Sequence, residues 1–211
     1  MTIYDITATI GDNLPVFGNE RPTSDKVFRL ANGAPYNFTK LHGSTHTGTH
    51  ADMPSHFIQD GTTCDTISLD HFYGRSKVLR IATTNHITEK DLARHDIDAG
   101  DIVLLSVGQS KHMQCATLKQ DFIALTPCAA EFLILKRVKT VGIDYLSVDP
   151  YKSTDFPVHK ALLGNGITIL EGLVLDHVPE GEYTLSALPL KVHDGDGSPV
   201  RAVLVKSDKE V

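Results

Sequence analysis

The chain has 211 residues, of which 41% are hydrophobic and 22% are charged, and its formal net charge at pH 7 is -6. This balance is that of a globular protein, and the length suits a single domain over residues 1–211. A mildly acidic chain without a basic run is a poor partner for nucleic acid or an anionic membrane surface, so we expect neither.

The first predicted elements are strands. Residues 2–10 alternate between apolar and polar side chains, which is typical of a strand. Residues 26–30 and 38–42 are two short strand candidates, and Asn32-Gly33 between them indicates a hairpin. The later strand candidates include apolar, branched runs that suit a sheet covered on both faces. These candidates are residues 77–82, 102–107, 141–145, 167–170, 185–192 and 200–205.

Three helices lie between these strands. Residues 88–95 predict a short helix with Thr88 as its cap. A second helix opens at Thr126-Pro127 and runs to about residue 138, because proline fits the first helical position. Residues 157–163 predict a third helix, which stops at Gly164. The sequence therefore predicts a mixed α/β domain with more strand than helix.

The segment from residue 46 to residue 56 reads HTGTHADMPSH and is the densest chemical signal in the chain. On a straight strand, His46 and Asp52 would lie about 20 Å apart, at ~3.3 Å per residue. A metal ion holds its ligand atoms within ~2.0–2.2 Å, so the segment must bend, and Gly48 permits that bend. Imidazole and carboxylate groups together suit Zn²⁺, Mn²⁺ or Fe²⁺. We therefore expect His46, His50 and Asp52 to bind metal.

Asp52 has two carboxylate oxygens and could bridge two ions, but the segment is too small to fill two sites. His159, in the third predicted helix, and Glu171, directly after a buried strand, are the best further candidates. A charged residue that ends a buried strand needs a partner, and a metal ion would supply one. The remaining histidines lack a neighbouring ligand at useful spacing, so we expect no metal at His42, His71, His86, His95, His112, His177 and His193.

We expect a cytoplasmic protein. The start of the chain lacks the regions of a signal peptide, and no apolar run approaches the ~20 residues of a membrane helix. The three cysteines form no CxxC pair, which favours reduced thiols. We expect each cysteine to fill the core as a small side chain.

At these residues the sequence resembles the cyclase family of metal-dependent hydrolases, which includes bacterial kynurenine formamidases and isatin hydrolases. The family motif HxGTHxDxPxH is complete at residues 46–56. Further matches span nearly the whole chain. They are residues 141–144, 147–150, His159 with 162–163, 169–173, 187–190 and 197–202.

The resemblance implies a role for each candidate residue. His46, His50 and Asp52 would hold one ion, and Asp52, His159 and Glu171 the second, with Asp52 as the bridge. His56 would be the general acid/base, taking a proton from water and returning it to the leaving nitrogen. The resemblance also implies a swivelling β/β/α fold, a homodimer or higher homo-oligomer, and two Zn²⁺ ions per subunit, with Mn²⁺ as the alternative metal.

The expected activity is that of an arylformamidase, which converts N-formylkynurenine to kynurenine and formate in tryptophan catabolism. Formamidases of this family usually carry Trp-Pro-Gly-Asp near the N-terminus, and the tryptophan lines the substrate site. Here the equivalent stretch is Pro-Val-Phe-Gly-Asn at residues 15–19, and the chain contains no tryptophan. Phe17 would then be the aromatic wall for substrate.

Two alternatives stay open. The altered stretch around Phe17 keeps a cyclic amide such as isatin as a possible substrate. A metal-binding module without turnover is the second alternative. Structural zinc sites usually have cysteine-rich shells, whereas this segment offers histidine and carboxylate together with a spare histidine, so it favours a catalytic site.

Overall fold

The computed structural model describes residues 1–18 and 21–206. Its strands are β1 (Thr2–Asp5), β2 (Thr23–Phe28), β3 (Phe38–His42), β4 (His50–Asp52), β5 (Tyr73–Arg80), β6 (Ile102–Ser106), β7 (Thr140–Ile143), β8 (Thr168–Glu171), β9 (Gly181–Ser186), β10 (Gly197–Pro199) and β11 (Val203–Lys206). Its α-helices are α1 (Glu89–Leu92), α2 (Pro127–Lys136) and α3 (Pro157–Gly164).

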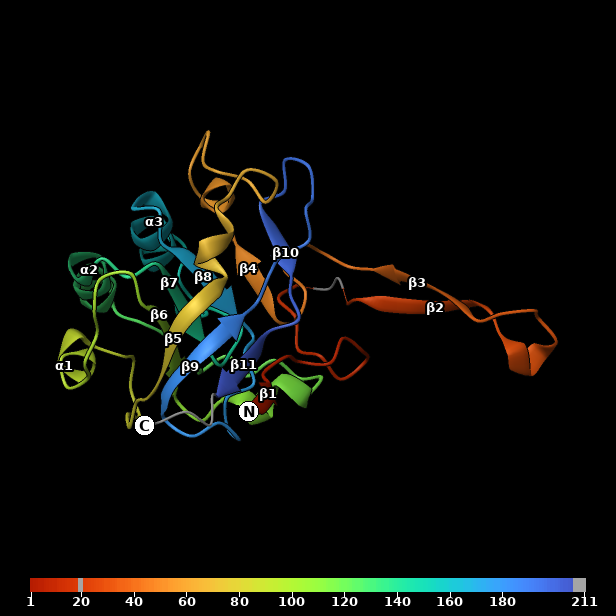
Figure 1. Cartoon of the computed structure of the whole chain (residues 1–211), viewed down its shortest axis with the longest axis horizontal. Coiled ribbons are helices and arrows are strands. Elements are labelled where there is room, and N and C mark those ends of the chain that lie inside the picture. The colour runs from red at the N-terminus through yellow and green to blue at the C-terminus, as the bar shows by residue number, and fades with distance from the viewer. Residues whose placement is uncertain (19–20, 207–211) are drawn as a thin grey trace.

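A nine-stranded mixed sheet forms the centre of the molecule, in the order β1-β11-β9-β5-β6-β7-β8-β4-β10. Strands β5 to β8 run parallel to one another, and the strands outside them pair antiparallel. The sheet curls, and the three α-helices lie along one of its faces (Figure 1). This arrangement confirms the predicted mixed α/β class with more strand than helix.

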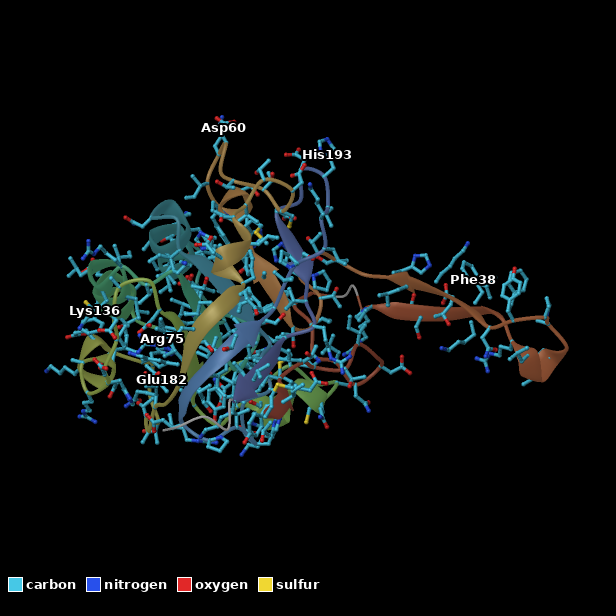
Figure 2. All side chains as sticks on the ribbon, in the orientation of Figure 1. Phe38, Asp60, Arg75, Lys136, Glu182 and His193 are labelled. Carbon is cyan, nitrogen blue, oxygen red and sulfur yellow. The ribbon has the colours of Figure 1, made fainter. Side chains whose placement is uncertain are left out.

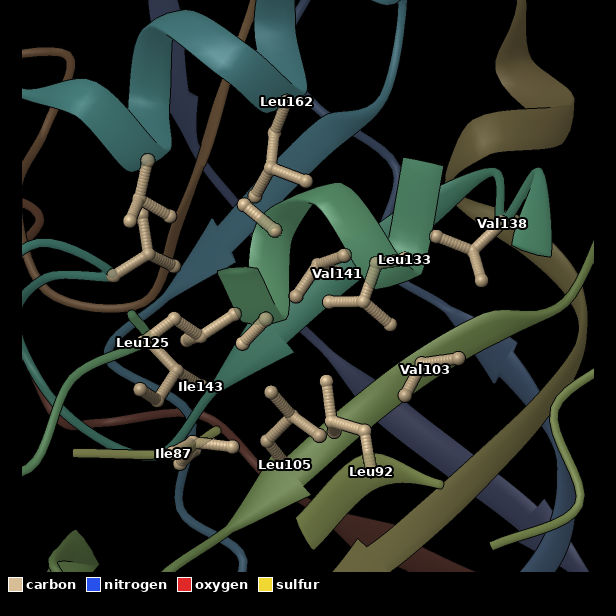
Figure 3. Packing of buried hydrophobic residues seen from close by; sticks show 14 of the residues in the cluster. Ile87, Leu92, Val103, Leu105, Leu125, Leu133, Val138, Val141, Ile143 and Leu162 are labelled. Atoms are coloured by element: carbon tan, nitrogen blue, oxygen red, sulfur yellow. The ribbon is translucent and has the colours of Figure 1, made fainter. Parts of the chain in front are cut away.

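Both faces of the central strands are buried, as their apolar sequences predict. On β6, Val103 and Leu105 pack in a cluster with α1, α2 and α3 (Figure 3). Ile102 and Leu104 point to the opposite face and pack in a second cluster inside the curl of the sheet. Complete burial of one such side chain contributes about 1.5–3 kcal/mol, so the two clusters hold the sheet edges that carry the functional residues.

The helix ends follow the sequence signals. Thr88 and Asp91 form a capping box at the start of α1. Helix α2 begins at Pro127, and the Thr126 hydroxyl accepts a hydrogen bond from the Ala129 amide at 3.2 Å. Helix α3 ends at Gly164, as expected. The predicted helix boundaries are therefore close, with α1 and α2 shorter than their sequence patterns indicate.

Several strand predictions need correction. Strand β1 ends at Asp5, so the expected strand over residues 2–10 is too long. The predicted strand over residues 185–192 ends at Ser186, where the ladder between β9 and β11 stops. The three-residue strands β4 and β10 were missed, because their sequences carry glycine, proline and polar residues rather than an apolar pattern.

The cysteine prediction holds for one residue only. Cys64 is buried, and its thiol lies 3.1 Å from the Gly197 carbonyl oxygen. Cys115 and Cys128 are exposed, so they are not core residues. All three thiols are free, in agreement with the absence of a pairing signal. Among the described residues, no helix has the length and apolar character needed to cross a membrane.

Strands β2 and β3 form a separate hairpin that projects from the body of the molecule (Figure 1). Every residue of the two strands is exposed. We call the segment 23–42 the arm. Phe38 lies on it, away from the main sheet (Figure 2). The other large exposed apolar residues of the arm are Val27, Phe28, Leu30, Tyr36 and Leu41. The hairpin expected around Asn32-Gly33 is confirmed, with Gly33 at a φ of 81°.

Candidate metal centre

The centre of the site is the pairing of β4 with β8. His50 lies directly across from Glu171, and Asp52 across from Ile169. Side chains two positions apart on a strand share a face, so His50 and Asp52 point to the same side. Ala51 points to the other face and packs in the core. The ladder register thus brings Glu171 to the two candidate ligands of β4.

The loop before β4 bends at Gly48, which has a φ of 68°. Gly172 also has a positive φ, and a Cβ at this position would collide with the carbonyl oxygen of Gly48. Thr49 ties the two segments together, because its hydroxyl donates a hydrogen bond to the Gly172 carbonyl oxygen at 2.6 Å. The predicted bend at Gly48 is confirmed, and the close contact explains why glycine follows Glu171.

The five predicted ligands lie together. Asp52 Oδ1 is 2.8 Å from His46 Nδ1 and 3.3 Å from His50 Nε2. His159 Nε2 is 3.2 Å from Glu171 Oε1 and 3.6 Å from Asp52 Oδ2. His50 Nε2 is 3.6 Å from Glu171 Oε2. Asp52 is therefore the residue that all three histidines face.

The outer nitrogens of two of these histidines are fixed. The Nδ1 of His50 donates a hydrogen bond to the Gly48 carbonyl oxygen at 2.9 Å. The Nδ1 of His159 donates to Asp149 Oδ2 at 2.7 Å. Each ring therefore turns its Nε2 towards the carboxylates, which is the arrangement that supports metal-binding histidines. Asp149 has no role in the sequence prediction, although it lies in the stretch 147–150 that carries part of the resemblance.

The charges of this cluster depend strongly on one another. Burial alone would raise the pKa of Asp52, but the facing histidines outweigh it and hold that pKa well below its usual range. Burial opposes the positive charge of His159, yet its contacts with Asp149, Asp52 and Glu171 raise its pKa to about 12. The same balance, with Asp52 as the main partner, raises the pKa of His46 to about 9. The cluster thus strongly favours positive charge beside its carboxylates.

One atom tests whether a cation fits this cluster. Asp52 Oδ2 is buried and has no hydrogen-bond partner, a costly state for an ionised carboxylate oxygen. His50, Asp52 and Glu171 offer ligand atoms that all lie within 4.8 Å of one another. Three imidazoles and two carboxylates are a donor set for zinc or manganese. The residues present therefore fit a divalent ion.

His56 lies beside this cluster, at the end of a short 3₁₀ helix over Pro54–His56. Its ring stacks on that of His46, with centroids 4.0 Å apart. Burial and then the nearby positive charges of His46 and His159 lower the pKa of His56, against the attraction of Asp52. His46, Asp52 and His56 also offer ligand atoms within 4.8 Å of one another. The role of His56 therefore has to be separated from ligation by experiment.

A cavity of about 610 Å³ opens onto the cluster. Phe17 lines it and stacks on Tyr151, with ring centroids 5.8 Å apart. Two aromatic residues that were not predicted, Phe57 and Phe156, line it as well. Asn19, part of the stretch compared with Trp-Pro-Gly-Asp, lies outside the described residues. The other lining residues are Pro15, Val16, Gly18, Ser44, His46, Thr47, His50, His56, Leu146, Ser147, His159 and Glu171.

Phe156 has a backbone feature that no sequence pattern reveals. Its φ is 48°, in the left-handed region that is costly for a bulky residue. It precedes α3, and its ring contacts that of Phe57 with centroids 5.2 Å apart. Strained residues persist where the surrounding structure holds them, which is common at functional sites.

Comparison with known proteins agrees with this site. The Cyclase family model, described as "Putative cyclase", matches residues 4–150. The chain is 38% identical to a kynurenine formamidase of Erythrobacter litoralis, over 96% of the chain and 93% of the relative. A structure described as a "predicted metal-dependent hydrolase" from Bacillus stearothermophilus has a TM-score of 0.83 at 34% identity, covering 96% and 97% of the two chains. Isatin hydrolase A from Labrenzia aggregata has a TM-score of 0.84 at 26% identity, covering 98% and 94%.

Proposed function

The chain belongs to the Cyclase family, and from this premise we propose that it is a metal-dependent hydrolase of amide C–N bonds, with an N-formyl aryl amine such as N-formylkynurenine as its substrate. The observation that carries the proposal is the convergence of three imidazoles and two carboxylates on one wall of an aromatic cavity. The name of the relative from Erythrobacter litoralis supports the choice of substrate.

We assign the metal ligands on the same contacts. His46, His50 and Asp52 would hold one ion, and Asp52, His159 and Glu171 a second. The unpartnered Oδ2 of Asp52, which His159 faces at 3.6 Å, supports the bridging role of this carboxylate. Two zinc ions are the first choice, with manganese as the alternative.

Bound divalent ions would polarise the substrate carbonyl and lower the pKa of water. His56 performs the proton transfers. Its lowered pKa leaves the ring neutral at neutral pH, so it can accept a proton from the attacking water. It then donates that proton to the leaving nitrogen, which releases formate and the aryl amine. Phe17, Phe57 and Phe156 enclose the aryl group in the apolar part of the cavity.

Metal analysis combined with the variant His56→Ala tests this function. The wild-type protein should hold close to two ions per chain and hydrolyse N-formylkynurenine. In the variant, turnover should fall about 10²–10⁴-fold, the usual contribution of acid–base catalysis, while the metal content stays the same. Loss of metal from the variant would make His56 a ligand instead. Inertness of the wild-type protein towards amides, with stoichiometric metal, would favour a binding module.

A second substrate class has its own support. Among the described residues that line the cavity there is no lysine or arginine, and Glu171 is the only carboxylate. An amino-acid head group needs charged partners when it leaves water, whereas a neutral cyclic amide such as isatin does not. A parallel assay on N-formylkynurenine and isatin separates the two substrates, since activity on isatin alone would select the cyclic amide.

We also propose that the chain acts as a homodimer or higher homo-oligomer, with the arm in the contact between copies. An isolated two-stranded hairpin is marginally stable at best in water. The arm nevertheless exposes six large apolar side chains over strands β2 and β3 and their connection. Exposed apolar surface of this kind is typical of an interaction site.

A further inference from the structure

A carboxylate outside the predicted ligand set lies at the edge of the stacked rings of His46 and His56. Asp196 Oδ2 is 3.1 Å from His46 Nε2 and 3.4 Å from His56 Nδ1. A single oxygen atom thus faces one nitrogen of a candidate ligand and one nitrogen of the candidate acid/base. The two histidines and Asp196 are 150 and 140 positions apart in sequence.

The backbone holds Asp196 firmly in this place. It precedes β10, which pairs with β4, and its carbonyl oxygen accepts a hydrogen bond from the Met53 amide at 3.0 Å. The other carboxylate oxygen, Oδ1, accepts a hydrogen bond from the Thr45 hydroxyl at 3.0 Å. The next residue is Gly197, where a Cβ would lie 2.6 Å from His46 Cε1. Glycine therefore allows the His46 ring to lie against the strand beside Asp196.

This geometry fixes where the protons are. An ionised carboxylate only accepts hydrogen bonds, so Asp196 favours a proton on His46 Nε2 and on His56 Nδ1. His46 is then left with Nδ1 to face Asp52, at 2.8 Å. His56 is left with Nε2 as its proton-accepting atom. His46 thus differs from His50 and His159, which turn Nε2 towards the carboxylates.

We propose that Asp196 is a positioning residue that sets the tautomers of His46 and His56 together. Through His46 it orients a ligand nitrogen, and through His56 it keeps Nε2 free to accept a proton. The second effect rests on the proposed function, whereas the first does not. In such pairs the carboxylate fixes the orientation and tautomer of the ring that does the chemistry.

The test is Asp196→Asn, which keeps the size of the side chain and removes its charge. Nitrogen-15 NMR of the zinc-loaded protein reads which ring nitrogen of His56 carries the proton, and we expect Nδ1–H in the wild-type protein and a mixture or Nε2–H in the variant. Titration of the metal-stripped full chain with Zn²⁺ should show an affinity about 10–100-fold weaker in the variant. The value of kcat should fall by a similar factor, while KM changes little.

Glu180→Gln is the matched control, because Glu180 Oε1 lies 3.2 Å from His95 Nδ1 in a carboxylate–histidine pair that lies outside the candidate site. It should leave kcat and zinc affinity unchanged. Asp196→Glu should restore part of both. If the Asn variant folds poorly, Thr45→Val, which frees Oδ1, should give a smaller change in the same direction.

Two results would overturn the proposal: a proton on Nε2 of His56 in the wild-type protein, or an unchanged His56 tautomer and zinc affinity in Asp196→Asn. A wild-type protein that hydrolyses neither N-formylkynurenine nor isatin would remove the proposed function instead. The NMR and zinc measurements would still decide the role of Asp196 in that case.

Discussion

The side chain of Asp149 joins the start of helix α3 to the candidate metal centre. Its Oδ2 accepts hydrogen bonds from the His159 backbone amide at 2.9 Å and from His159 Nδ1 at 2.7 Å. Its Oδ1 accepts from the Val158 amide at 3.1 Å. One carboxylate therefore satisfies the first turn of the helix and holds the ring that faces Asp52 and Glu171.

The variant Asp149→Ala should lose both effects. We expect the affinity for Zn²⁺ to fall about 10–100-fold, because the ring of His159 loses its support. The free energy of unfolding should fall by about 1–2 kcal/mol, because amide groups at the helix start lose their acceptor. Calorimetric titration and urea unfolding of the metal-stripped protein measure the two quantities. Unchanged zinc affinity would show that Asp149 serves the helix alone.

The bridging role of Asp52 predicts that both ions depend on it. In Asp52→Ala, both ions should weaken together, whereas in Glu171→Gln only one should be lost. Metal analysis after gel filtration against chelator-free buffer gives the content of each variant. Full metal content in the Asp52 variant would rule out the bridge.

Phe156 can be tested with a pair of variants that both remove its ring. In Phe156→Ala and Phe156→Gly, KM for an aryl substrate should rise about 2–10-fold, because an aromatic contact contributes about 0.5–1.5 kcal/mol. The glycine variant should be about 1 kcal/mol more stable than the alanine variant, because only glycine adopts a φ of 48° without strain. Equal stability of the two variants by thermal unfolding would contradict the strain.

Asp144 predicts a dependence of stability on pH. Burial raises its pKa to about 6, although the backbone amides of Gln109, Val107 and Gly108 favour the charged form. Because the folded pKa lies above the unfolded one, the stabilising contribution is complete below about pH 4 and is lost as the pH rises through 6. A shift of this size corresponds to about 3 kcal/mol.

In Asp144→Asn this pH dependence should disappear. The free energy of unfolding of the variant, relative to the wild-type protein, should therefore rise by about 2–3 kcal/mol between pH 4 and pH 7. Urea unfolding with a chelator present at each pH measures the difference without a contribution from metal. A difference that stays constant across this range would show that Asp144 does not titrate there.

The arm predicts a change in assembly. Phe38→Ser combined with Leu41→Ser should reduce the mass in solution towards that of one chain of 23.0 kDa, while the circular dichroism of the body stays the same. Light scattering after gel filtration measures the mass. Leu135→Ser is the control, because Leu135 is 81% exposed on α2 and should have no effect. A wild-type protein that is already monomeric would contradict the proposed role of the arm.

The sequence indicated the convergence at the candidate site because donors at close spacing around Gly48 leave few alternatives. His159 and Glu171 were reached through a weaker argument, the need of a buried charge for a partner. Strand β4 itself was not expected, because its three residues are recognisable only through their pairing with β8. Local pattern is silent about such long-range pairing.

Asp149, Asp196 and Phe156 were missed for a related reason. The two aspartates matter through contacts with rings that lie 10 and 150 positions away, and an aspartate in a loop has many uses. Phe156 is an ordinary aromatic residue until its positive φ is known. Its preceding position, next to Pro157 at the start of a helix, gives no sign of the left-handed backbone.

The register between β4 and β8 separates two parts of the protein that can change independently. His50 and Glu171 are held opposite each other by ladder hydrogen bonds, whereas Phe57 and Phe156 lie in connections beside the sheet. Insertions or substitutions in those connections would reshape the cavity without moving the paired donors. Relatives that share this ladder could therefore acquire new amide substrates during evolution while their reaction stays the same.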